Sequence, residues 1–79
     1  MQEQEIYSAL NEIFRDVLDE ESITLSPDTT ADDIEDWNSL SHIQLVSEIE
    51  KHFNIRFSSR EIMMWRNVGE MVQTILSRV

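Results

Sequence analysis

The sequence predicts an all-α protein: a small four-helix bundle with three main helices, a short third helix, and a long loop between helices one and two. Apolar residues recur at helical spacing in several separate segments. Good helix caps, Asn38, Ser58 and Asn67, stand just ahead of three of these segments. The chain has one Gly and one Pro, which indicates nearly continuous structure. Its 79 residues suffice for a single domain, expected to span residues 1–79.

The first helix is predicted over residues 4–19. An apolar stripe defines it, because its members lie three or four positions apart and therefore share one face. The stripe consists of Ile6, Leu10, Ile13, Phe14, Val17 and Leu18. We interpret it as core.

The helical period disappears between Glu20 and Trp37, where turn-forming residues gather around Pro27. A loop of this length in a compact domain is usually functional or anchored. Its expected anchors are Ile23, Leu25 and Ile34, and residues 28–33 are expected to form a short helical turn.

The second helix is predicted from about Ser39 to Phe53, with Asn38 as N-cap and Asn54 as left-handed terminator. Leu40 is expected to point outward near Ser39. The apolar stripe consists of Ile43, Val46, Ile49 and Phe53, with Leu45 beside it.

Ser58 and Glu61 have the spacing of a capping box, which predicts a brief third helix through about Trp65. Asn67 is a second cap and opens a fourth helix that extends to about Ser77. The apolar residues of these helices are Ile62, Met63, Trp65, Val68, Met71, Val72, Ile75 and Leu76. We interpret the methionines among them as adaptable core filling; the alternative is that Met63 and Met64 line a variable cavity.

The net charge of −10 is unevenly distributed. Residues 1–53 carry 14 acidic residues against Arg15 and Lys51, whereas residues 54–79 carry four arginines against two glutamates. The acidic part would repel phosphate backbones, so nucleic-acid binding is not expected, and it would attract basic protein surfaces. The alternative is that the acidity serves solubility alone.

No apolar run approaches the roughly 20 residues that span a bilayer. The N-terminal residues lack the features of a signal peptide, so we expect no membrane insertion and a cytoplasmic location. The chain has no cysteine and therefore no disulfide.

Asp36, Ser39 and His42 are spaced by three and resemble a catalytic triad, but we reject that interpretation. An activated serine needs a base within about 3 Å and oxyanion donors in a pocket that excludes water. The single glycine lies far from Ser39 in the sequence, and His42 is interpreted as a helix-surface residue. His42 and His52 are ten residues apart, not the three or four that metal ligands on a helix need. No catalytic residue and no metal site are expected.

Ser39 nevertheless occupies a favourable position for carrying a covalent group. It lies where the chain turns into a helix, so we expect its hydroxyl to be exposed. The positive end of the helix dipole would stabilise a phosphate attached there.

The motif Asp36-Trp37-Asn38-Ser39-Leu40, with the apolar residues that follow it, resembles the acyl carrier proteins. Those residues are Ile43, Leu45, Val46, Ile49, Phe53, Ile55 and Phe57, and the resemblance extends over essentially the whole chain. It implies a non-catalytic carrier in which a phosphopantetheinyl transferase attaches 4′-phosphopantetheine from coenzyme A to Ser39. The thiol of that arm would hold acyl groups as thioesters for lipid, polyketide or related specialised biosynthesis.

The expected partners are acyl ligases, synthases and transferases with basic docking patches. The candidate contact residues are Asp36, Leu40, Ile43, Ser47, Glu48 and Glu50. A monomer is expected. Five apolar residues have two interpretations, plain packing or a core that opens around an acyl chain: Leu45, Ile49, Ile62, Met63 and Met71.

The sequence departs from the family pattern at Asn38, where Asp is usual. Asn caps a helix about as well, but it removes a charge beside the expected phosphate. Gln44, Lys51 and His52 also make the second helix less acidic than in fatty-acid carriers. These departures indicate a specialised carrier with its own enzymes. Two alternatives stay open: an aminoacyl or peptidyl carrier, such as a D-alanyl carrier, and an unmodified acidic helical adaptor.

Overall fold

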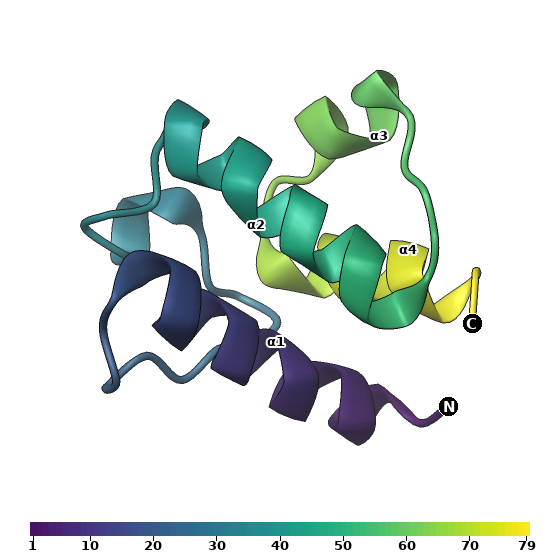
Figure 1. The fold of residues 1–79 in the computed structure, drawn as a ribbon, viewed down its shortest axis with the longest axis horizontal. Helices are drawn as coiled ribbons and strands as arrows, with labels where there is room; N and C mark the ends of the chain where they lie inside the picture. Colours follow the sequence, from purple (N-terminus) through teal and green to yellow (C-terminus); the bar gives the residue numbers. More distant parts are fainter.

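The computed structural model describes residues 1–79 and contains four α-helices and one 3₁₀ turn (Figure 1). The elements are α1 (Glu3–Leu18), η1 (Ala31–Asp33), α2 (Ser39–Phe53), α3 (Ser59–Met64) and α4 (Val68–Leu76). The predicted four-helix fold with a short third helix and a long first loop is confirmed. The helical turn expected within residues 28–33 is η1.

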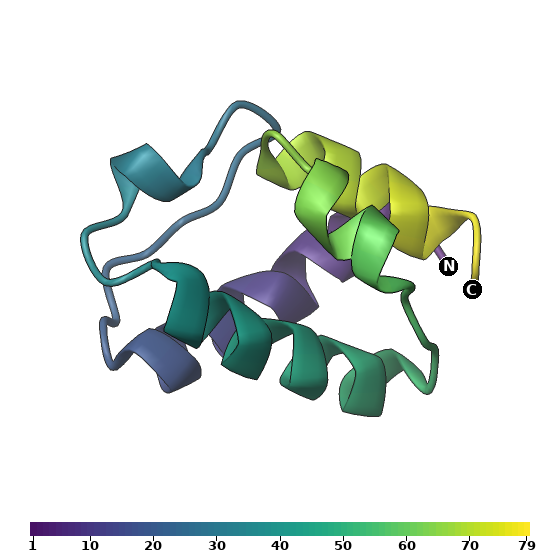
Figure 2. The same ribbon diagram turned by 90° about the horizontal axis from the view of Figure 1, so that it is seen from above.

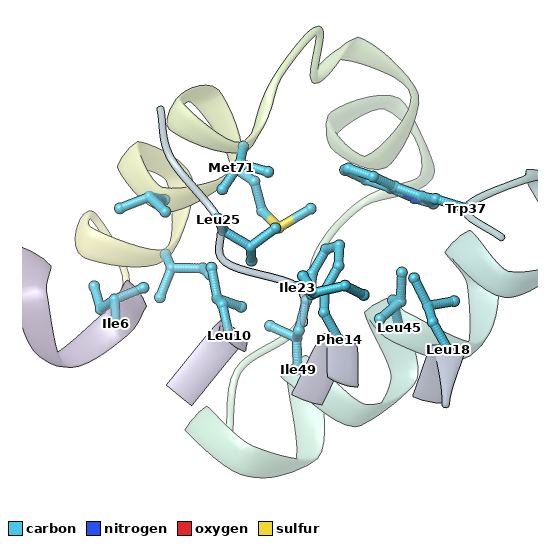
Figure 3. Close-up of a cluster of buried hydrophobic side chains, with 13 residues drawn as sticks. Ile6, Leu10, Phe14, Leu18, Ile23, Leu25, Trp37, Leu45, Ile49 and Met71 are labelled. Carbon is cyan, nitrogen blue, oxygen red and sulfur yellow. The ribbon is translucent and has the colours of Figure 1, made fainter. Parts of the chain in front are cut away.

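Helix α1 lies against both α2 and α4, and the two chain termini lie at the same end of the molecule (Figures 1 and 2). The buried cluster comes from these three helices and from the long loop. Trp37 lies at one end of the cluster and Ile6 at the other (Figure 3). Its members are Ile6, Leu10, Phe14, Leu18, Ile23, Leu25, Trp37, Leu45, Ile49, Val68, Met71, Val72 and Ile75.

The long loop is fastened to α1 and α4 rather than free. Two of its predicted anchors, Ile23 and Leu25, are buried, and Ile34 is half-buried. The Leu25 amide donates to Asn11 Oδ1 at 2.7 Å, and Arg15 Nε donates to the Ile23 carbonyl at 2.6 Å. These bonds satisfy backbone groups that the loop leaves without helical partners.

The predicted apolar stripe of α2 is wrong at one position. Ile43 is 66% exposed, whereas Leu45, Val46 and Ile49 are buried. Two residues correspond to about 200° around an α-helix, so a helix that buries Leu45 must turn Ile43 toward solvent. Leu40, which was expected to point outward, is 70% exposed.

The interpretation of the methionines as core filling holds only for Met71, which is buried. Met63 and Met64 are 85% and 65% exposed. Helix α3 has six residues, and none of them is buried. So short a helix lies at the rim of the bundle and does not supply a full apolar face to the core.

Candidate functional site

The turn into α2 is built by reciprocal capping between Asn38 and Ser41. Asn38 Oδ1 accepts from the amides of Leu40 and Ser41, both at 3.0 Å. Ser41 Oγ accepts from the Asn38 amide at 2.8 Å and donates to the Asp36 carbonyl at 2.8 Å. The predicted cap at Asn38 is confirmed, and the arrangement is a capping box with serine at the third helical position.

The two serines of this turn therefore differ in availability. Ser41 is buried and its hydroxyl is occupied by the cap. Ser39, the first residue of α2, is exposed. The role of Ser41 was not predicted, because the capping-box pattern that is recognised in a sequence has Glu or Gln at this position.

Trp37 fixes the turn to the core. It is 8% exposed, and its ring meets that of Phe14 on α1 edge-on, with centroids 5.0 Å apart. Its indole Nε1–H donates to His42 Nδ1 at 3.0 Å. Trp37 and Asn38, which precede Ser39, are thus held by packing and hydrogen bonds, while Ser39 itself is exposed.

The interpretation of His42 as a simple surface residue is wrong. The ring is half-buried, stacks on Trp37, and places Nε2 3.3 Å from the Ile62 carbonyl of α3. Because an indole N–H only donates, Nδ1 must be the acceptor, and the neutral ring carries its proton on Nε2. Both ring nitrogens are engaged, so neither is available as a base for Ser39, which supports rejection of the triad.

A pocket of about 590 Å³ lies beside Ser39, bounded by η1, the start of α2 and helix α3. Ser39 and Asn38 contribute to its lining together with a mainly apolar set: Trp37, Ile43, Ile62, Met63, Trp65 and Met71. Of the two methionines that the alternative placed at a cavity, Met63 lines this pocket and Met64 does not. Of the five residues with two interpretations, Ile62, Met63 and Met71 line this pocket, whereas Leu45 and Ile49 are packed in the closed core.

Helix α3, the far wall of the pocket, is fixed at its start by charge. Ser58 Oγ accepts from the Glu61 amide, and Glu61 accepts from the Ser58 amide at 2.9 Å, which confirms the predicted capping box. Arg78, near the C-terminus, pairs with the Glu61 carboxylate. The Ser58 amide and the Arg78 guanidinium hold the pKa of Glu61 below its ordinary value.

Comparison with known proteins identifies the family. The family model for phosphopantetheine attachment sites matches residues 8–75. The solution structure of holo acyl carrier protein from Geobacter metallireducens is similar, with a TM-score of 0.81 and 41% identity over 91% of this chain and 86% of that one. The chain belongs to the acyl carrier protein family. A search of the curated proteins found no significant match.

As an acyl carrier protein, the chain is a carrier and not an enzyme, and its prosthetic group is covalently attached 4′-phosphopantetheine. Carriers of this family work with phosphopantetheinyl transferases and biosynthetic enzymes. The carrier has no cluster of three or more side chains suited to holding a metal ion. None of its helices combines the length and apolarity needed to cross a membrane.

The expected partner-contact residues of this carrier differ in their surroundings. Asp36, Leu40, Ile43, Ser47 and Glu48 are exposed. Glu50 is half-buried, and its carboxylate accepts from the Phe57 amide at 2.8 Å. That bond gives Glu50 a structural role in holding the connection between α2 and α3.

Proposed function

We propose that Ser39 is the residue that carries 4′-phosphopantetheine and that residues 1–79 work as one carrier domain. The observation that carries this proposal is the contrast between the two serines of the turn. The hydroxyl of Ser39 is exposed at the first position of α2, whereas that of Ser41 is consumed by the cap.

The surroundings of Ser39 suit a phosphodiester. The first turn of α2 contains no acidic residue, so the positive end of the helix dipole is not neutralised there. When bound, the arm supplies a terminal thiol that holds an acyl group as a thioester. Asn38 and Trp37 keep the attachment point rigid, and the pocket beside Ser39 offers an apolar surface to what is attached.

We propose that the pocket favours acyl groups over aminoacyl or peptidyl groups, for use in lipid, polyketide or related specialised biosynthesis. Its lining from Ile43, Ile62 and Met63 presents apolar carbon next to Ser39, and apolar cargo gains by leaving water. A set of loaded carriers with increasing acyl length tests this. Thermal stability that rises with chain length supports acyl cargo, and stability that ignores chain length supports the aminoacyl alternative.

Partner enzymes are proposed to dock on a face formed by Asp36, Leu40, Ile43, Ser47 and Glu48, which we call the docking face. Residues 39–47 contain no Asp, Glu, Lys or Arg, so the centre of this face is neutral and partly apolar. Acidic residues lie at its two ends and suit ligases, synthases and transferases with basic patches. Glu50 is proposed as a lesser contact, because its carboxylate is already bonded to the Phe57 amide. The cytoplasmic location and the monomeric state stay predictions.

Intact-mass spectrometry tests the attachment site. The natural chain, Ser39→Ala and Ser41→Ala are each incubated with coenzyme A and a phosphopantetheinyl transferase of broad specificity. The natural chain and Ser41→Ala should gain the mass of one phosphopantetheinyl group, and Ser39→Ala should gain none. A natural chain that stays unmodified would support the adaptor alternative, and a modified Ser39→Ala would place the arm elsewhere.

A further inference from the structure

We propose that His42 is a positioning residue that joins α3 to α2 and thereby sets the shape of the pocket beside Ser39. The effect of His42 on attached cargo rests on the proposed function of Ser39, whereas the connection between α2 and α3 does not depend on that function. In this role the imidazole links three separate parts of the chain: the end of the long loop, α2 and α3.

The two hydrogen bonds of His42 have a defined direction. Trp37 Nε1–H donates to His42 Nδ1 at 3.0 Å, so the ring must donate from Nε2 to the Ile62 carbonyl at 3.3 Å. The ring can serve both partners in only one neutral tautomer. Its orientation is fixed further by stacking on Trp37, with centroids 5.9 Å apart and planes 25° from parallel.

Helix α3 has few attachments within its own six residues, although Trp65, which follows it, donates to Thr74 of α4 at 3.0 Å. No residue of α3 is buried, and Figure 1 shows the helix at the edge of the bundle. Its start is held by the Glu61–Arg78 pair. Its last turn is held by the bond from His42 to the Ile62 carbonyl and, just beyond, by Trp65, whose ring meets that of His42 edge-on at 6.1 Å.

The two residues joined by this bond, His42 and Ile62, both line the pocket beside Ser39. Trp37, His42, Ile62 and Trp65 all line it, together with Ser39. A displacement of α3 away from His42 would therefore move one wall of the space that an attached group occupies. His42 acts on the pocket by holding Trp37 and Ile62 in place, and it is not required to touch the arm.

Protonation of His42 would undo the arrangement. The imidazolium carries donors on both nitrogens and has no lone pair to accept from Trp37. Arg66, the charged residue that lines the same pocket, is paired with Glu70 of α4, and Glu61 of α3 is paired with Arg78. None of these side chains is hydrogen-bonded to the ring, so no carboxylate on the neighbouring elements takes over as its partner.

Nitrogen-15 NMR of the histidine rings in the natural, unmodified chain tests the bond directly. His42 should show the Nε2–H tautomer near pH 8, with Nδ1 as the hydrogen-bond acceptor. The exposed His52 is the internal reference for a ring without these partners. The opposite tautomer for His42, or free exchange between the two, would overturn the proposal.

Amide hydrogen exchange tests the consequence for α3. His42→Leu keeps an apolar side chain but can make neither bond, His42→Gln keeps a donor that can reach toward Ile62, and His52→Leu is the matched control. Exchange at residues 62–64 should accelerate roughly tenfold in His42→Leu, less in His42→Gln, and not at all in His52→Leu. Equal exchange in all four proteins would refute the role, and the tautomer measurement decides the matter if a variant fails to fold.

The two proposals fail separately. If His42 positions α3 but Ser39 is not the attachment site, the tautomer and exchange results hold while either the natural chain stays unmodified or Ser39→Ala gains the mass of the phosphopantetheinyl group. If Ser39 is modified in every His42 variant but α3 exchange is unaffected, the carrier proposal stands and the role of His42 is refuted.

Discussion

The amide of Gly69 donates to the carbonyl of Pro27 at 3.0 Å, so the only glycine and the only proline of the chain are direct partners. The neighbouring amide of Val68 donates to the Thr29 carbonyl at 2.9 Å. These bonds satisfy two free amides at the start of α4 and fasten the middle of the long loop. The loop can therefore run from α1 to Ser39 without being loose.

Gly69→Ala is expected to destabilise the protein, because an added Cβ would lie 2.9 Å from the Pro27 carbonyl oxygen. The backbone there must shift, at a cost of about 1–3 kcal/mol. The gain in helix propensity, about 1 kcal/mol, offsets part of that loss. Urea denaturation should show a net loss of stability for Gly69→Ala, with exposed Gln73→Ala as the α4 control. An unchanged urea midpoint for Gly69→Ala would mean that the loop at Pro27 moves aside without a measurable loss of stability.

Asn38 is expected to be important for stability through its cap. Asn38→Ala removes the acceptor of two amides and should cost about 1 kcal/mol in the free energy of unfolding. Asn38→Asp keeps that acceptor and adds a charge that the helix dipole favours, so it should be as stable or slightly more stable. Denaturant unfolding of the two variants checks this. A loss for Asn38→Asp equal to that of Asn38→Ala would contradict the capping role.

The attachment of α3 is expected to weaken in acid through Glu61. Its folded-state pKa is lowered below the ordinary 4.5, first by the Ser58 amide and further by Arg78. A carboxyl with a lowered pKa adds stability above its unfolded pKa and loses it as the pH falls through the folded pKa. In an NMR pH titration, Glu61 should therefore titrate below the ordinary value. Arg78→Gln should raise that midpoint only partly, because the Ser58 amide stays; no change at all would show that Arg78 does not act on Glu61.

The helices and their caps were predictable from sequence because each depends on neighbours in the chain. Asn38, Ser58 and Asn67 are close to the helix starts they cap, and the observed boundaries fall within one or two residues of those predicted. A cap forms within one turn, so local sequence is enough to specify it.

The sequence-based predictions that were wrong concern residues whose neighbours come from distant segments of the chain. Whether His42 is exposed depends on where α3 lies, and Ile62 is 20 positions away in the sequence. Met63 satisfies an apolar pattern, but its burial would require α3 to pack deeper than six residues allow. Periodicity places residues on a common face and does not say what covers that face.

Trp37 is expected to be the most sensitive residue near Ser39. Trp37→Ala would leave a cavity against Phe14 and remove the partner of His42, at a cost of about 3–5 kcal/mol. Trp37→Phe keeps a ring in place and loses the hydrogen bond, which should cost about 1 kcal/mol. Thermal unfolding followed by circular dichroism separates the two effects. Equal losses would show that the hydrogen bond, and not the packing, dominates.

Ile43 is expected to affect partner recognition and not folding. Its side chain is 66% exposed, so Ile43→Asp should change the free energy of unfolding by no more than about 0.5 kcal/mol. Leu45, two positions on, is fully buried, and Leu45→Asp should unfold the chain because it buries an unpaired charge. The same substitution at Gln73, which is exposed on α4 and not part of the docking face, is the control for added charge. The initial rate of phosphopantetheinyl transfer should fall for Ile43→Asp and change little for Gln73→Asp. Equal rates in these two variants would show that Ile43 is not part of the docking face. The exposure of Ile43 would then not be explained by partner binding.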